Sequence, residues 1–357
     1  MLVYLLIFIL ASFLFFFNKK DSALSLAFFF IVFVFIAGFR DMIGGFDVYI
    51  YGEIYEAKVI QILNYESFEK GFRFYLVALK NLSNDRYFMF FATSFLMTFL
   101  HFRILKKTSP ILFFSIFIYF CKFFLMSFVY LRQGIALGLV WSSLLFLNKK
   151  YIRFFVLLIT AYFIHKSAIL FAPFYFISKV KISTKAMILI AFIALFISLT
   201  SISNTLFGFL ADSANNEKFN KYINKSSDIN FFYLFEVFLL IILLLKFKTK
   251  FYETEKGKMI LNGLFCYIII SILSLTNATF VRFTWYYLIF ILLTLPSIYE
   301  FIKRKEQKNL FKLAVYFYYS LLFFRLLIVY DNGDFMPYKS IFQNFDRQGR
   351  WEFMEYR

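Results

Sequence analysis

Charged residues are scarce in this sequence. They make up 17% of its 357 residues, whereas hydrophobic residues make up 62%, and the mean hydropathy is +0.73. A soluble globular chain is about a quarter charged and about half apolar. The composition therefore excludes an ordinary soluble fold, and it predicts that apolar runs of about 18 residues or more cross a membrane.

Cysteine is rarer still, with two residues, and both lie inside apolar runs. Cys121 and Cys266 can form neither a disulfide framework nor a CxxC metal motif, so we expect both to be small packed hydrophobic side chains. The acids Asp41 and Asp47 do not form a DxD pair. We predict no metal site and no cofactor, and a metal site at these acids is the alternative.

Gly/Ser-rich linkers and soluble repeats are absent, and apolar runs fill nearly the whole chain. The expected fold is a single membrane domain over residues 1–357, all-α and polytopic, with about ten to twelve transmembrane helices. Full spans are expected near residues 1–17, 23–39, 87–105, 109–127, 128–147, 186–211, 231–247, 259–275, 282–302 and 311–330.

Residues 151–178 are too few for two full spans, which need about 40 residues. Two short paired helices that meet near His165 fit this stretch better, with the turn buried in protein. Non-helical backbone at membrane depth is tolerated only against protein or a water-filled cavity. This turn is therefore a candidate place for a site.

Positive charge is in excess, with a formal net charge of +18. The positive residues are scattered in short clusters between spans rather than gathered on one soluble face, which argues against nucleic-acid binding and is typical of the positive-inside rule. The clusters are Lys19-Lys20, Arg103/Lys106-Lys107, Lys149-Lys150/Arg153, Lys179/Lys181/Lys185, Lys246 through Lys258, and Lys303-Arg304-Lys305/Lys308. If they are cytoplasmic, both termini are outside, and the outer segments are the loops 40–86 and 212–230 and the tail 331–357.

Three arginines lie at the expected outer ends of spans: Arg40, Arg132 and Arg282. A charge near the bilayer centre costs roughly 2.5–3.5 kcal/mol, so such residues usually line a cavity or pair. The arginine fork fits phosphate oxygens bidentately. The alternatives are a helix-end pair of Arg40 with Asp41, a snorkelling anchor at Arg132, and an aromatic belt around Arg282.

The chain has two histidines, His101 and His165. Imidazole is the side chain most easily poised for proton transfer near neutral pH, so His165 at the expected buried turn is a candidate base. The alternative for His165 is a hydrogen-bonded core residue. His101, at the cytoplasmic end of its span, is interpreted as structural.

These segments together resemble the EpsG family within the O-antigen polymerase (Wzy-type) group, over about residues 38–342. The matching segments are Arg40-Asp41 with Gly44, Asp47 and Tyr51; Glu69-Lys70-Gly71-Phe72; Arg132-Gln133 with Ala136; the basic loop at 149–150; Ala161 with His165-Lys166-Ser167-Ala168; Arg282 before Tyr286-Tyr287 and Pro296; and Met336-Pro337-Tyr338-Lys339.

The resemblance implies a GT-C-like membrane glycosyltransferase with an outward-facing cavity, in the bacterial cytoplasmic (inner) membrane. It implies polymerisation of undecaprenyl-pyrophosphate-linked repeat units into O-antigen, capsular polysaccharide or exopolysaccharide at the outer face. The partners implied are the lipid-linked glycan donor and acceptor and the bilayer, together with a chain-length regulator and a flippase.

Under this resemblance, the site residues fall into two groups. A pyrophosphate leaving group needs cations in a cavity of low dielectric constant, and the acceptor hydroxyl needs a base, for which His165 or an acid of the outer loop could serve. The catalytic candidates are His165, Arg132, Asp41 and Asp47. The substrate-binding candidates are Arg40, Gln133, Glu69, Arg282, Tyr338 and Lys339.

Other functions are a flippase or transporter of the same lipid, a ligase that transfers the glycan to another acceptor, and a non-catalytic membrane subunit. The two halves of the chain have no convincing internal repeat of the kind many transporters carry, and the unusual polar residues concentrate at one expected membrane face. The ligase uses nearly the same chemistry as the polymerase, so the sequence hardly separates them.

Overall fold

The computed structural model describes residues 1–17, 22–147, 150–200, 202–203, 205, 231–331 and 333–343. Within these ranges the chain is helical apart from turns, connections and an isolated antiparallel bridge between Arg40 and Ser340. The expected outer loop 212–230 lies outside the described residues, as do residues 206–211 of the preceding expected span and residues 344–357 of the expected tail.

Among the described residues, four helical segments are long and apolar enough to cross a membrane, by length and composition: Arg86–Thr108, Glu255–Leu273, Phe280–Phe301 and Lys305–Val329. Shorter apolar helices fill most of the other expected spans, such as Leu2–Phe17 and Ala23–Gly38. The prediction of an all-α polytopic membrane protein is confirmed.

The chain divides into two compact units, and each is described by itself. The first unit comprises Met1–Ser142, Phe163–His165 and Ile302–Arg357, and the second comprises Ser143–Tyr162 and Lys166–Phe301.

The first unit is built around α7 (Leu112–Phe123), which packs against α1 (Leu2–Phe17), α6 (Arg86–Thr108) and α18 (Lys305–Val329). Every residue of α7 except Lys122 is buried, so its packing with these neighbours makes the core of the unit. The interfaces are largely aromatic: Phe120 lies 4.7 Å from Phe323 between ring centroids, and Phe15 lies 4.7 Å from Phe117. The neighbouring α2 (Ala23–Gly38) packs along α6.

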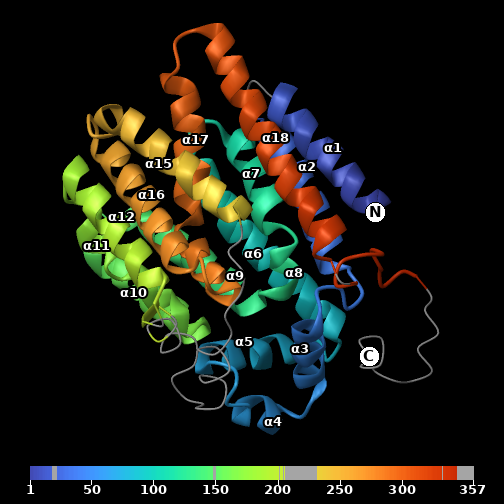
Figure 1. The fold of residues 1–357 in the computed structure, drawn as a ribbon. Coiled ribbons are helices and arrows are strands. Elements are labelled where there is room, and N and C mark those ends of the chain that lie inside the picture. The colour runs from blue at the N-terminus through green and yellow to red at the C-terminus, as the bar shows by residue number, and fades with distance from the viewer. Residues whose placement is uncertain are drawn as a thin grey trace. The chain divides into compact units, whose positions relative to one another are not determined.

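Three short helices occupy most of residues 40–86: α3 (Phe46–Glu56), α4 (Val59–Asn64) and α5 (Lys70–Lys80). They lie together at one end of the first unit, at the bottom of Figure 1, where α3 and α5 contact α6. The helix α6 begins there because Asp85 caps it, accepting a hydrogen bond from the backbone N–H of Tyr87 at 2.9 Å. The expected outer loop is thus a small helical layer.

The segment that follows α18 is tied to the end of α2. Tyr4 donates a hydrogen bond to the carbonyl of Phe335 at 2.8 Å, and the N–H of Asp41 donates to the carbonyl of Lys339 at 2.9 Å. Buried backbone groups need partners, and these pairings hold residues 335–341 against α1 and α2.

The stretch 151–178 breaks at a histidine. The helix α10 (Tyr151–Ile164) ends directly before His165, and the 3₁₀ helix η2 (Lys166–Phe171) and the short α11 (Phe174–Ile177) follow. The break places His165 on non-helical backbone, which belongs to the first unit.

The second unit is organised by α16 (Glu255–Leu273), which packs against α12 (Thr184–Ser198), α15 (Phe231–Phe251) and α17 (Trp285–Phe301). The 3₁₀ helix η3 (Ala278–Thr284) joins α16 to α17 and contacts both. A Cβ at Gly263 would lie 2.3 Å from the ring of Phe290. Glycine therefore lets α16 and α17 approach closely.

The orientation in the membrane is tested by cysteine labelling in a background with Cys121→Ala and Cys266→Ala. Asn64 on α4 and Gln307 on α18 are both exposed in the structure. If the short basic clusters are cytoplasmic, a membrane-impermeant maleimide should label Asn64→Cys in intact cells and Gln307→Cys only after lysis. The reverse pattern would invert the orientation.

Candidate functional site

Arg132 lies in the first turn of α9 (Leu131–Ser143), just after the short helix α8 (Met126–Val129). Its Nη1 donates hydrogen bonds to the carboxylate Oε2 of Glu69 at 2.6 Å and to the carbonyl of Ser67 at 2.9 Å, and its Nε donates to the hydroxyl of Tyr51 at 3.1 Å. Among the described residues, its Nη2 has no hydrogen-bond partner. The arginine is therefore held in place while one face of the fork can still receive an anion.

Glu69 is the residue that precedes α5, and its carboxylate is shared. One oxygen accepts the hydrogen bond from Arg132, and the other, Oε1, lies 2.8 Å from Nδ1 of His165. The side chains of Arg132, Glu69 and His165 are 23%, 9% and 16% exposed. The three groups form a compact cluster, called here the Arg–Glu–His cluster, that is mostly buried yet still reached by solvent.

The contact with Glu69 determines which nitrogen of His165 carries a proton. An ionised carboxylate only accepts hydrogen bonds, so Nδ1 must be the donor. In neutral His165, Nε2 then carries the lone pair. This is the arrangement that orients a histidine as a base in hydrolytic triads.

The charge state of Glu69 follows from its two partners. Burial by itself would raise the pKa of Glu69, but the hydrogen bond from His165 and the charges of His165 and Arg132 outweigh it and hold the pKa well below its usual range. Glu69 is therefore ionised at neutral pH. Its contribution to stability is present above the ordinary pKa of a glutamate and is lost as the pH falls through the lowered value.

Aromatic rings enclose the guanidinium. The ring of Phe68 lies 4.8 Å from Cζ of Arg132, and the ring of Tyr51 lies at 5.9 Å. The two rings stack with centroids 5.2 Å apart. Cation–π contacts of this kind strengthen when the cation is partly desolvated, so the aromatic wall favours one position of Arg132.

Burial raises the pKa of the Tyr51 hydroxyl, with further raising by the charges of Asp47 and Glu69 and an opposing effect of Arg132. Tyr51 is therefore neutral and accepts the hydrogen bond of Arg132. Asp47 lies one helical turn before Tyr51 on α3 and is exposed. Since residues four apart share a helix face, Asp47 lies at the solvent rim of the Arg–Glu–His cluster.

A glycine brings α5 close to the break at His165. A Cβ at Gly71 would lie 2.7 Å from the carbonyl oxygen of Phe163, nearer than real Cβ atoms approach. Since Gly71 is two residues from Glu69 and Phe163 is two residues from His165, this close approach supports the Glu69–His165 contact.

Arg40 lies in a second, separate cluster of polar contacts at the end of α2. It is fully buried, and its Nε, Nη1 and Nη2 donate to the carbonyls of Ile43, Ala37 and Phe128. Its guanidinium also lies over the ring of Phe90 at 4.8 Å. These contacts favour a structural role for Arg40, the closing of a helix end, over the predicted binding of substrate.

Three other predicted site residues gather near Arg40. The carboxylate of the buried Asp41 accepts a hydrogen bond from the hydroxyl of Tyr87 at 2.8 Å. The hydroxyl of Tyr338 donates to the carbonyl of Ile36 at 2.9 Å, and the backbone of Lys339 bonds to Asp41. All three take part in the attachment of the C-terminal segment to α2.

The last two predicted residues lie elsewhere. Gln133 follows Arg132 on α9 and is buried. Arg282 belongs to the second unit, on η3, with its Cζ 5.5 Å from the ring centre of Phe283. The structure thus brings together Arg132, Glu69 and His165, with Asp47 at the rim.

Four residues around Arg132 and Glu69 were not predicted as site residues from the sequence: Tyr51, Ser67, Phe68 and Gly71. Tyr51 and Gly71 lie within segments that carried the resemblance, which was the available signal. The carbonyl of Ser67 and the ring of Phe68 had no such signal, because their use depends on how residues 65–69 fold back onto α9.

His101 is buried on α6 and is structural in its contacts. Its Nδ1 lies 2.8 Å from the hydroxyl of Tyr119 and its Nε2 lies 2.9 Å from the carbonyl of Gly134. It thereby links α6 to α7 and α9.

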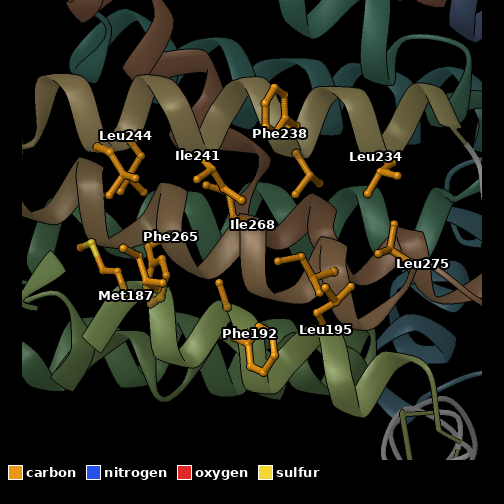
Figure 2. Close-up of a pocket in the computed structure, with 15 residues that line it drawn as sticks. Met187, Phe192, Leu195, Leu234, Phe238, Ile241, Leu244, Phe265, Ile268 and Leu275 are labelled. Carbon is orange, nitrogen blue, oxygen red and sulfur yellow. The ribbon is translucent and has the colours of Figure 1, made fainter. Parts of the chain in front are cut away.

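The second unit contains an apolar pocket of about 320 Å³ between α12, α15 and α16. Figure 2 shows lining side chains such as Leu234, Leu244, Ile268 and Leu275 in the space between the three helices. The lining offers no group for acid–base or phosphate chemistry. Within the residues that the structure describes, no group of three or more His, Cys, Asp or Glu side chains could hold a metal ion.

Comparison with protein families finds a match to the EpsG family over residues 23–340. No curated protein and no solved structure matches the chain.

The close approach at Gly71 is tested by Gly71→Val. The added side chain must push α5 away from Phe163, and overpacking of this kind typically costs about 1–3 kcal/mol. We expect a lower melting temperature of the purified protein in detergent. Ala78→Val, on the exposed face of the same helix, introduces the same residue and should leave the melting temperature nearly unchanged. Equal melting temperatures for both variants would contradict the tight packing.

Proposed function

Because the chain belongs to the EpsG family, we propose that it polymerises lipid-linked oligosaccharide repeat units by glycosyl transfer. The family and the helical fold support a role in polysaccharide biosynthesis at a membrane. The observation that carries the finer proposal is the Glu69 carboxylate shared by Arg132 and His165. It provides a held cation and an oriented base side by side.

The substrates in this proposal are two glycans, each attached to undecaprenyl pyrophosphate. A hydroxyl of the acceptor glycan attacks the anomeric carbon of the donor glycan. The bond between that carbon and the pyrophosphate oxygen breaks, and its electron pair leaves with the undecaprenyl pyrophosphate. The product is the acceptor lengthened by the donor glycan.

Arg132 acts on the leaving group. Negative charge grows on the pyrophosphate as the bond breaks, and preorganised donors in a partly buried site stabilise such charge well. The fork is already positioned by Glu69, Ser67 and Tyr51, so little reorganisation accompanies the reaction. Its Nη2 is the donor directed to the phosphate.

His165 acts on the acceptor. Its Nε2 removes the proton of the attacking hydroxyl, and Glu69 stabilises the imidazolium that results. Glu69 is thus a positioning residue, because it acts through His165 and Arg132. Asp47 at the rim is placed to accept hydrogen bonds from sugar hydroxyls.

The proposed setting is the outer face of the bacterial cytoplasmic membrane. The basis is the positive-inside pattern, which puts the layer of α3, α4 and α5 outside. The Arg–Glu–His cluster lies in this layer and at the adjoining end of α9. A transporter would need polar groups along a path through the membrane, whereas these groups gather at one end of the first unit.

The role of Arg132 is tested by Arg132→Lys. Lysine keeps the charge but loses the fork that reaches Glu69, Tyr51 and phosphate together. We expect long-chain glycan synthesis to fall on the order of 10²–10³-fold, the typical loss when a dominant transition-state donor is removed. His165→Ala should cost roughly 10²–10⁴, the contribution of general base catalysis.

The matched control is Arg86→Lys, in the same expected outer layer. Arg86 also pairs with a glutamate, Glu56, at 2.6 Å, but has no proposed site role. Cells with the Arg86→Lys variant should make glycan of wild-type length. All variants must accumulate in the membrane at equal levels, and wild-type polymer from both Arg132→Lys and His165→Ala would refute the site.

A strain that lacks the protein distinguishes the polymerase function from the flippase function. Without a polymerase, lipid-linked units still reach the outer face, so cells should display single repeat units on the usual acceptor. Without a flippase, the units stay on the inner leaflet and none is displayed. Electrophoresis of the surface glycan distinguishes the two, and a complete absence of single units would favour the flippase.

A further inference from the structure

The first unit has an open groove between α2 and α6, with a volume of about 550 Å³. Its lining comes from one face of each helix and divides into an apolar part and a basic part. The lining residues are Ala23, Leu26, Ala27, Phe30, Phe99, Phe102, Arg103, Lys106 and Lys107.

The apolar part of the groove includes two small residues of α2. Ala23, Leu26, Ala27 and Phe30 follow the three- and four-residue spacing of one helix face. The two alanines leave room beside the larger Leu26 and Phe30. On a helix of a membrane protein, such a surface suits a hydrocarbon chain.

The basic part consists of Arg103, Lys106 and Lys107 near the C-terminal end of α6, all exposed. No described residue forms a hydrogen bond or an ion pair with these three side chains. At the other end of the same helix, Arg86 is paired with Glu56. A favourable interaction with the helix dipole accounts for cations at this end, but not for the groove beside them.

We propose that this groove binds one anionic glycerophospholipid, with its phosphate at Arg103, Lys106 and Lys107 and an acyl chain along Ala23, Ala27 and Phe30. Charge complementarity selects an anionic over a zwitterionic lipid. Basic residues next to a membrane-spanning helix attract the anionic lipids of the cytoplasmic leaflet, which is the side where the positive-inside rule puts these three. The proposal is independent of the glycosyl-transfer site.

The test is native mass spectrometry of the purified full chain with added phosphatidylglycerol or phosphatidylcholine. We expect one retained phosphatidylglycerol and at least about tenfold less phosphatidylcholine. The triple variant Arg103→Gln/Lys106→Gln/Lys107→Gln should lose phosphatidylglycerol by about tenfold or more, given the attraction per basic residue. Equal retention of the two lipids by the wild type would overturn the proposal.

A charge-matched control distinguishes a specific lipid site in the groove from general electrostatic attraction of the lipid to the protein. The triple variant Lys303→Gln/Arg304→Gln/Lys305→Gln removes three exposed cations from the expected cytoplasmic side, outside this groove. It should retain phosphatidylglycerol like the wild type. An equal loss in both triple variants would mean that net charge alone attracts the lipid, and would overturn the proposal.

A second pair of variants tests the apolar part with all cations present. Ala27→Trp should fill the groove and reduce retained phosphatidylglycerol severalfold, whereas Leu24→Trp, at a position 80% exposed on the same helix and outside the groove, should not. Undiminished binding to Ala27→Trp would contradict an acyl chain in the groove.

Competition identifies the source of the phosphate. Neither inorganic phosphate nor an equimolar amount of undecaprenyl phosphate should displace phosphatidylglycerol. Displacement by inorganic phosphate would reduce the groove to an anion site, and displacement by undecaprenyl phosphate would make it a site for the carrier lipid. Either result would overturn the proposal.

Discussion

The pairing of one mostly buried carboxylate with two basic groups organises the candidate site. Glu69 can remain ionised because Arg132 lies 2.6 Å from one oxygen and His165 lies 2.8 Å from the other. A buried charge without partners would be costly, so the start of α5, the start of α9 and the break after α10 must meet. The placement of His165 beside Arg132 follows from this requirement.

The two arginines at the ends of α2 and α9 show how partners decide a role. Both are at helix ends, and both lie over aromatic rings. Each nitrogen of Arg40 donates a hydrogen bond to a backbone carbonyl, and the side chain is fully buried, so it is closed to a ligand. Arg132 keeps some solvent exposure, and its Nη2 has no partner among the described residues, so the same residue type is open to a ligand there.

The two ends of α6 differ in the same way. At one end Arg86 is neutralised by Glu56, within the layer that carries the Arg–Glu–His cluster. At the other end three cations project beside an apolar groove. The helix α6 thus runs from the layer that carries the proposed glycosyl-transfer site to the groove proposed to bind lipid.

The sequence by itself determined the membrane class and most of the helices, because both depend on local apolar runs and on residues such as His165 that interrupt them. The sequence made Arg132, Glu69 and His165 candidate site residues, but it did not reveal that the Glu69 carboxylate contacts both of the others. Glu69 is 63 residues from Arg132 and 96 residues from His165 along the chain. Nor could the sequence separate the buried Arg40 from Arg132, since both follow apolar helices. Only tertiary packing decides which carbonyls, rings and carboxylates surround a given side chain, because those partners come from distant parts of the chain.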